Sequence, residues 1–224
     1  MARKKLLMGE VAKDSDLVFN TPASFLEFFY QLNCEIVLEL ACGKAAYVRE
    51  LAKRYPNRFF IGVDVKADRI GYAVEKAREE SLDNVAFLNI RIEDLADFFP
   101  ENSISEIWVT FADPFLKPSK SNRRLTAPGF LEIYSKMLKS EGLLHIKTDS
   151  DLLYEFSLDS LKANPDFDIL AVTDDLYSLD DLPLDLIIQT PFEQKHLKNN
   201  LTIKYVLSLR KPEGNCGSCS CCGE

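Results

Sequence analysis

Apolar residues along this chain fall into short runs rich in leucine and β-branched side chains, separated by longer amphipathic stretches. The runs predict buried strands at residues 36–40, 59–63, 85–90, 104–111 and 143–147. The other stretches predict helices at residues 47–55, 67–80, 129–138 and 151–163. Strands that alternate with helices of about ten or more residues are typical of a parallel sheet covered by helices on both faces.

The two ends of the chain complete the predicted fold. Thr21 and Pro22 form a good helix start, and apolar residues then recur at near-helical spacing up to Leu32. Two further strands are expected at 168–172 and 201–209, and the second alternates as an antiparallel strand near a sheet edge does. We therefore expect an α/β fold with a mostly parallel seven-stranded sheet. Its parts are an N-terminal segment with a helix (1–32), the main domain (33–211) and a tail (212–224).

Size and composition agree with one ordinary globular domain. The chain has 224 residues, of which 46% are hydrophobic and 28% charged. The longest unbroken apolar run is four residues, so we expect no membrane-spanning segment. Glu10 interrupts the apolar stretch after the basic residues at 3–5, and we therefore expect no signal peptide and a cytoplasmic protein.

The distribution of charge matters more than the net charge of −8. Residues 150–189 contain ten acidic residues and one basic residue, so the rest of the chain is close to neutral. We interpret this acidic run as a solvated helix face and loop. The low net charge excludes a uniformly basic nucleic-acid binder, but it leaves a locally basic RNA-binding surface possible.

The cysteines divide into two groups. Cys34 and Cys42 stand alone in apolar sequence, which predicts buried thiols. The other four lie in the last nine residues, at Cys216, Cys219, Cys221 and Cys222. Four thiolates could hold zinc or copper(I), but no second cysteine pair follows at the spacing of a zinc finger. We therefore expect a disordered tail and no metal site.

The first two predicted strands are followed by residues that suit a nucleoside ligand. The first ends in Glu39 and a turn with small residues at Ala41, Gly43 and Ala45, which let a ligand approach the backbone. The second ends in Asp64, 21 residues after Gly43, where an acid can accept hydrogen bonds from a ribose diol. The turn has a single glycine, and Glu39 would repel a pyrophosphate, so a cationic ligand such as S-adenosylmethionine fits better. The alternative is an ordinary strand–turn–helix with an acidic cap.

The later strand ends combine carboxylates with a basic stretch. Asp113-Pro114 follows the fourth strand, and four basic residues come next without an intervening acid, at Lys117, Lys120, Arg123 and Arg124. Such a stretch can neutralise RNA phosphates, or it can be a solvated loop. Asp149 ends the fifth strand, and Thr190 and Glu193 add a hydroxyl and a third carboxylate. His145 lies on the fifth strand and is interpreted as a core histidine.

These motifs together resemble the bacterial tRNA (guanine-N7)-methyltransferase family over residues 20–210. The matching pieces are Glu39 to Gly43, Asp64, Asp113-Pro114-Phe115-x-Lys117 with Arg123-Arg124-Leu125-Thr126, His145 to Asp149, and Thr190-x-Phe-Glu193. The resemblance implies a class I S-adenosylmethionine-dependent methyltransferase (Rossmann-like) fold and transfer to N7 of a guanosine in the tRNA variable loop. It implies tRNA as partner and no obligate protein partner.

The resemblance also implies a role for each matching residue. Asp113 and Asp149 would be catalytic. The cofactor site would comprise Glu39, Gly43, Asp64, Arg91, Ile92 and Asp113. The tRNA site would comprise Lys117, Arg123, Arg124, Asp149, Thr190 and Glu193.

The chain departs from the family pattern at four positions. Similar proteins have glycine where this chain has Ala41 and Ala45, and usually tryptophan at Phe115. They also have an aspartate, which accepts a hydrogen bond from the adenine amino group, where this chain has Arg91. A guanidinium cannot accept that bond, so a backbone carbonyl, Glu93 or Asp94 would have to replace it. Two alternatives follow: an RNA-binding protein of this fold with weakened or lost catalysis, or a methyltransferase with another acceptor. A nicotinamide oxidoreductase is disfavoured by the missing glycines.

Overall fold

Within the part of the chain that the structure describes, eight strands join into one sheet in the order β1-β4-β3-β2-β5-β6-β8-β7. The computed structural model describes residues 2–212, so the cysteine-rich tail lies outside the described residues. The strands are β1 (Val18–Phe19), β2 (Glu35–Leu40), β3 (Arg58–Val63), β4 (Val85–Leu88), β5 (Ile104–Thr110), β6 (Leu138–Thr148), β7 (Phe167–Thr173) and β8 (Lys204–Arg210). The α-helices are α1 (Ala2–Lys13), α2 (Pro22–Phe29), α3 (Ala46–Arg54), α4 (Ala67–Glu79), α5 (Leu95–Phe98), α6 (Pro128–Met137), α7 (Asp151–Ala163) and α8 (Pro191–Leu197). Three short 3-10 helices are η1 (Ile92–Asp94), η2 (Pro118–Arg123) and η3 (Leu176–Ser178).

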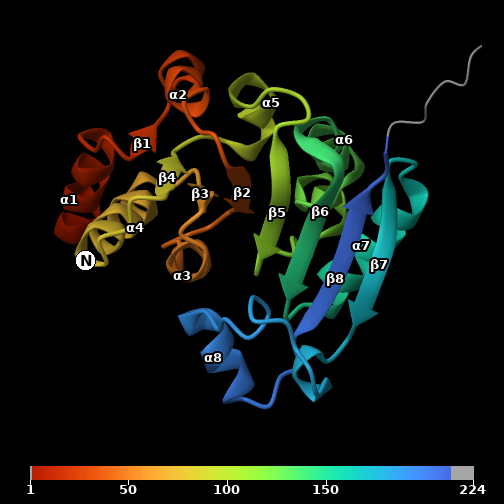
Figure 1. Cartoon of the computed structure of the whole chain (residues 1–224). Coiled ribbons are helices and arrows are strands. Elements are labelled where there is room, and N and C mark those ends of the chain that lie inside the picture. The colour runs from red at the N-terminus through yellow and green to blue at the C-terminus, as the bar shows by residue number, and fades with distance from the viewer. Residues whose placement is uncertain (1, 213–224) are drawn as a thin grey trace, which may run out of the picture.

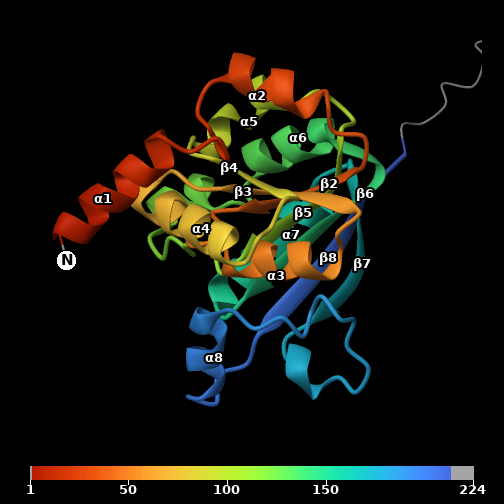
Figure 2. The same ribbon diagram turned by 60° about the vertical axis from the view of Figure 1, so that its left-hand side comes forward.

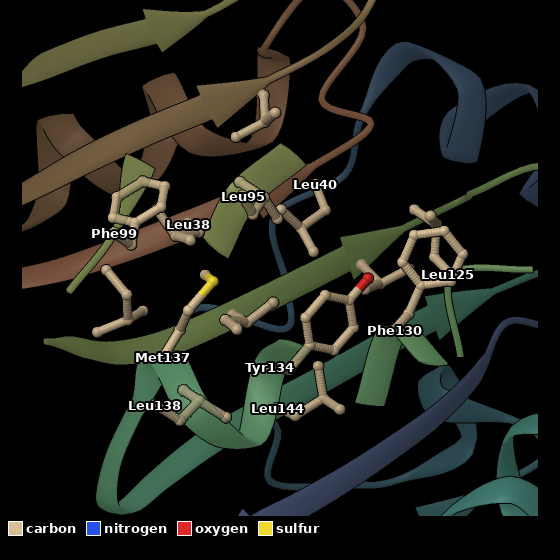
Figure 3. Close-up of a cluster of buried hydrophobic side chains, with 14 of the residues drawn as sticks. Leu38, Leu40, Leu95, Phe99, Leu125, Phe130, Tyr134, Met137, Leu138 and Leu144 are labelled. Carbon is tan, nitrogen blue, oxygen red and sulfur yellow. The ribbon is translucent and has the colours of Figure 1, made fainter. Parts of the chain in front are cut away.

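Helices cover both faces of the sheet, as the alternation of strands and helices predicts (Figure 1, Figure 2). Successive side chains of a strand point to opposite faces. In β2, Leu38 and Leu40 therefore join a cluster with α2, α5 and α6, whereas Val37 joins a second cluster with α3 and α4. Figure 3 shows the first cluster, in which Leu95 of α5 and Tyr134 of α6 lie over the strands. Burial on both faces explains why the central strands have continuous apolar sequences.

The direction of the strands places the carboxyl ends of the parallel strands at one edge of the sheet. All neighbouring strands from β1 to β6 pair in parallel, so their carboxyl ends share an edge. Next to β6, β8 runs antiparallel, and edge strand β7 pairs with it. This confirms the antiparallel strand expected near an edge. The sheet has one strand more than expected because the two-residue β1 pairs with β4, and two residues are too few to show a sequence period.

Three local features differ from the expectations. The helices α1 and α8 were not expected, and β6 begins at Leu138 rather than at residue 143. The prediction of a buried Cys34 is wrong: Cys34 is exposed in the loop before β2, while Cys42 is buried as predicted. Loops run over the surface, so an apolar neighbourhood in sequence does not bury a loop residue. Among the described helices, none has both the length and the apolar character that a membrane crossing requires.

Two other expectations are confirmed. None of the ten acidic residues in the 150–189 run is buried, so this run is a solvated surface. His145 is a core residue: its ring stacks on Trp108 at 3.8 Å between centroids, and its Nδ1 lies 2.8 Å from the hydroxyl of Tyr205. Burial lowers the pKa of His145 to about 3, so the ring is neutral at physiological pH.

The unexpected helix α1 packs closely against α4. Gly71 of α4 lies against the backbone of Met8, and a Cβ at this position would overlap the carbonyl oxygen of Met8. Met8 and Ala12 are the buried residues of α1 and are four residues apart, so they lie on one face of the helix. The missing side chain at residue 71 therefore lets the two helices meet.

We expect Gly71→Ala to separate α1 from α4 and to lower the free energy of unfolding by about 1–3 kcal/mol. The matched control is Gly9→Ala in α1, where a Cβ would meet no atom within 4 Å. That variant should be at least as stable as the wild type, because alanine is the better helix former by about 1 kcal/mol. Urea unfolding of the three proteins measures the difference, and equal stability of all three would contradict the close contact.

Candidate active site

The turns after the parallel strands form a pocket at the carboxyl edge of the sheet. Its volume is about 770 Å³, within the range of roughly 300–1,000 Å³ typical of small-molecule sites. In Figure 1, α8 lies below the arrowheads of β5 and β6, at this edge. The predicted site residues that line the pocket are Asp64, Arg91, Ile92, Asp113, Arg123 and Asp149. A second pocket, between α7 and β7, is lined by none of the predicted site residues.

Asp64 joins the turns after β2 and β3. Its Oδ2 accepts a hydrogen bond from the Gly43 N–H at 2.9 Å, and its Oδ1 accepts one from the Lys66 N–H at 2.8 Å. The guanidinium of Arg69 lies 3.5 Å from Oδ2. A carboxylate has about four lone-pair positions, so Asp64 can still accept hydrogen bonds from a ligand. Gly43 takes part through its backbone, at a positive φ of 58° that suits glycine.

The two alanines of this turn keep a glycine-like backbone. Ala41 has φ 55° and Ala45 has φ 54°, both in the left-handed region. This conformation costs an alanine roughly 1–2 kcal/mol relative to a right-handed one. The surrounding turn therefore holds both residues in an unfavourable conformation that glycine would adopt without strain. Ala41 itself lines the pocket.

Glu39 lies beneath the turn rather than in the pocket. It is 2% exposed, and its two oxygens accept hydrogen bonds from the Val48 N–H at 3.0 Å and the Thr110 hydroxyl at 2.6 Å. These bonds connect β2 to α3 and to β5. Burial raises the pKa of Glu39 to about 7, against the opposing effect of the two hydrogen bonds.

The loop after β5 presents Asp113 in a strained backbone. Asp113 is exposed, and its Oδ1 accepts a hydrogen bond from the Phe115 N–H at 2.9 Å. Phe111 and Phe115 flank it with φ values of 52° and 41°, which are rare for bulky residues. Strain of this kind gathers at functional sites, where the surrounding structure holds it in place.

The basic residues of this loop differ in their placement. Arg124 is buried, and its guanidinium donates to the carbonyl oxygens of Pro114 and Phe115 at 2.9 and 3.1 Å. Arg124 therefore shapes the loop instead of facing solvent. Arg123 is exposed, lines the pocket and lies over the Phe115 ring at 5.4 Å. Lys117 is exposed on the same loop but does not line the pocket.

Asp149 follows β6 and lies half-buried in the pocket wall. Its Oδ2 is 3.3 Å from the Nδ1 of His196 on α8. Since β5 and β6 are neighbours, Asp113 and Asp149 both come to the same pocket, as the sequence predicts.

Thr190 and Glu193 start α8 and do not line the pocket. The Thr190 hydroxyl accepts a hydrogen bond from the Glu193 N–H at 3.2 Å, and the Glu193 carboxylate accepts one from the Thr190 N–H at 3.3 Å. This capping box satisfies two backbone donors at the helix start. Glu193 is fully buried, and its Oε1 lies 2.7 Å from the Nζ of Lys147.

The sequence reasoning missed Lys147 and Phe192. Lys147 is fully buried in β6, and its Nζ also donates to the carbonyl oxygens of Leu186 and Ile188 at 3.0 Å each. Burial lowers its pKa, although Glu193 opposes the shift. A lysine at the buried end of a predicted strand was the available signal for a buried ion pair. Phe192 lines the pocket with 47% of its surface exposed, and no signal besides its place beside Glu193 indicated it.

Arg91 and Ile92 line the pocket on the side of β4. The Arg91 guanidinium lies 3.2 Å from the Glu93 carboxylate, which lines the same pocket. Burial opposes ionisation of Glu93, but a backbone N–H and the guanidinium groups of Arg91 and Arg123 outweigh it and lower its pKa. Glu93 is therefore an ionised acceptor close to the position where the family has its aspartate.

Known proteins match the chain over most of its length. The family model described as "Putative methyltransferase" matches residues 33–206. The tRNA (guanine-N(7)-)-methyltransferase of Christiangramia forsetii is 39% identical over 86% of this chain and 86% of that protein. The protein of the same name from Porphyromonas gingivalis is 40% identical over 80% of this chain and 72% of that protein. The crystal structure of the 16S rRNA methyltransferase KamB matches with a TM-score of 0.62 at 12% identity, over 87% of this chain and 95% of that one.

The sheet order is that of the class I methyltransferase fold, which the solved structure shares, and the family model identifies the chain as a methyltransferase. The two relatives match over most of this chain and most of their own length, so the comparison shows the family as well as the fold. The chain belongs to the tRNA (guanine-N(7)-)-methyltransferase family, which confirms the resemblance seen in its motifs.

The raised pKa of Glu39 makes a testable contribution to stability. In the folded protein the pKa of Glu39 is about 7, above its ordinary value of 4.5, so the free energy of unfolding falls as pH rises from about 4.5 to about 7. Glu39→Gln removes this titration. Between pH 5 and pH 8 the wild type should lose on the order of 2–3 kcal/mol more unfolding free energy than the variant. Urea unfolding across this pH range measures it, and parallel pH profiles would contradict the raised pKa.

Proposed function

We propose that this protein transfers the methyl group of S-adenosylmethionine to N7 of a guanosine in the variable loop of tRNA. One observation carries the proposal: Asp113 and Asp149 converge from neighbouring strand ends on the pocket that Asp64 also lines. The names of the family relatives support the reaction. With tRNA as substrate, we also propose a cytoplasmic enzyme without an obligate protein partner.

The pocket residues fit the proposed cofactor. Asp64 retains acceptor positions for a ribose diol, and Glu93 can accept from the adenine amino group in place of the family's aspartate. The carboxylates of Asp64, Glu93 and Asp113 in the lining suit a ligand that carries an ammonium and a sulfonium. A related structure, of a mutant 16S rRNA (adenine(1408)-N(1))-methyltransferase from Catenulisporales acidiphilia, contains the cosubstrate SAM; it has a TM-score of 0.61 at 16% identity.

The reaction requires the protein mainly to position the two reactants and to stabilise the positive charge that develops on the guanine ring. When bound, S-adenosylmethionine would supply a methyl group on a positively charged sulfur. The free lone pair of guanine N7 needs no deprotonation; it would bond to the methyl carbon as the carbon–sulfur bond breaks, so that neutral S-adenosylhomocysteine leaves and the positive charge passes to the guanine ring. Asp113 and Asp149 lie in the pocket where the guanine ring would become positively charged, and their carboxylates would stabilise that charge. Holding the two reactants in line can itself supply a large part of the rate.

A carboxylate can also select the base. Guanine presents the N1–H and the 2-amino group as donors on one edge, whereas adenine has an unprotonated N1 there. We assign Asp149 to that edge, because it belongs to the wall of the pocket and keeps acceptor positions beyond the contact of its Oδ2 with His196. The base must leave its stack to enter such a pocket, which is easier in a loop than in a duplex.

The RNA backbone is assigned to the exposed basic side chains of the loop after β5. Lys117, Lys120 and Arg123 are exposed there, beside the pocket mouth. Arg124 and Glu193 are buried and would act by shaping the loop and anchoring α8.

Arg91 favours one alternative function, an RNA-binding protein with weakened catalysis. Its guanidinium lies in the proposed cofactor pocket, and a protein that no longer depends on the cofactor would tolerate a cation there. To decide, the protein is incubated with S-adenosylmethionine and tRNA lacking N7 methylation, and the digested nucleosides are analysed by mass spectrometry. New 7-methylguanosine supports the methyltransferase, whereas tRNA retention without product supports the alternative.

We expect Asp149→Asn to lower methyl transfer by at least about 100-fold, because one carboxylate that stabilises the charged ring is lost. The Kd for S-adenosylmethionine, measured by calorimetry, should stay within a few-fold of the wild-type value. Loss of cofactor binding in this variant would contradict the assignment of Asp149 to the guanine.

We expect Lys117→Ala to weaken tRNA binding and to reduce the slope of log K against log salt by about one unit, as the loss of one phosphate contact does. The matched control is Lys162→Ala, since Lys162 is exposed at the end of α7, on the opposite edge of the sheet. Filter binding at several salt concentrations measures both. Equal slopes for the two variants would remove Lys117 from the RNA surface.

A further inference from the structure

Phe192 is a large apolar side chain held at the pocket rather than in the core. It lines the pocket, and 47% of its surface is exposed. Exposed apolar side chains also occur away from the pocket, as at Tyr30, so exposure alone marks no site. Phe192 combines an exposed aromatic face with a place in the pocket lining, and this combination points to a ligand that covers the ring.

The ring packs against two others. Phe111 lies 5.3 Å from it, at an interplanar angle of 56°, and His196 lies 4.3 Å from it, at 39°. Both distances are close to the usual range for aromatic pairs. His196 in turn lies 3.3 Å from Asp149, so this aromatic group adjoins the carboxylate assigned to the guanine edge.

One residue, Lys147, anchors both sides of this group. The Phe111 N–H donates to the Lys147 carbonyl oxygen at 2.8 Å, which holds Phe111 in its left-handed backbone. The Nζ of Lys147 is paired with Glu193, the residue after Phe192. The capping box then fixes the start of α8. Phe192 is consequently positioned before any ligand arrives.

We propose that Phe192, backed by Phe111, is the surface on which the target guanine stacks when it enters the pocket. The inference rests on the proposed function and adds the residue that positions the base. The opposite wall of the pocket belongs to Asp64 and Glu93, at the ends of β3 and β4. In the strand order, β2 and β5 lie between β3 and β6. The end of β3, next to Asp64, is therefore three strand spacings, roughly 14 Å, from the end of β6, next to Asp149. The ring is thus at the acceptor end of the pocket, away from the residues assigned to adenosine.

The test compares side chains of similar size at residue 192. Phe192→Leu keeps an apolar side chain but removes the aromatic face, and it should lower kcat/KM for tRNA by roughly tenfold to a hundredfold. Phe192→Tyr and Phe192→Trp should stay within a few-fold of the wild type. The Kd for S-adenosylmethionine and the Tm should be unchanged in all three. The matched control is Tyr30→Ala, which removes an exposed aromatic ring outside the pocket and should leave kcat/KM unchanged.

A binding measurement observes the stacking directly. Trp108 is the only tryptophan and is 1% exposed, so the F192W variant adds one exposed reporter of fluorescence. A tRNA transcript should quench this fluorescence, and a transcript with an abasic target position should quench it several-fold less.

Equal kcat/KM for the leucine and tyrosine variants, or equal quenching by the two transcripts, overturns the stacking role while the proposed function stands. A wild-type protein that forms no 7-methylguanosine overturns the proposed function, and this inference falls with it.

Discussion

The buried ion pair between Lys147 and Glu193 is the contact on which the carboxyl edge of this molecule depends. Both side chains are fully buried, and their charged atoms lie 2.7 Å apart. Taking two charges out of water costs several kcal/mol each, which is offset only if every polar group finds a partner. Here the Lys147 ammonium also contacts the carbonyl oxygens of Leu186 and Ile188. The pair thereby fastens the chain between β7 and β8 to the carboxyl end of β6.

That attachment supplies one wall of the pocket at the carboxyl edge of the sheet. The segment held by Lys147 carries α8, which contributes one wall of the pocket. The opposite wall comes from Asp64, which joins the turns after β2 and β3 through two backbone N–H groups. Between them, Asp113 stands on a loop whose shape is held by the guanidinium of Arg124. Charged side chains thus have two roles: the buried ones hold loops at the edge of the sheet, and the exposed ones are available to bind a ligand.

The left-handed residues show how much the edge is constrained. Ala41, Ala45, Phe111 and Phe115 all have positive φ at or near the pocket. Each costs on the order of 1–2 kcal/mol relative to a relaxed backbone, so neighbouring contacts must outweigh the strain. The alanines show that the turn shape is imposed by hydrogen bonds such as the one from Gly43 to Asp64, rather than by glycine alone. For this reason a missing glycine in the motif did not change the fold.

The alternating architecture, the order of the strand ends and the candidate carboxylates Asp64, Asp113 and Asp149 could all be predicted from the amino-acid sequence. Those features depend on apolar periodicity and on parallel strands sharing an edge, which are both local or topological properties. Which charged side chains face the pocket depends on contacts in the folded protein and could not be predicted in this way. Arg124 and Glu193 turned inward, Phe192 stayed at the pocket, and α1 docked on α4 through Gly71. Burial and pairing depend on partners distant in sequence, as Lys147 and Glu193 are, and no local pattern reports such a partner.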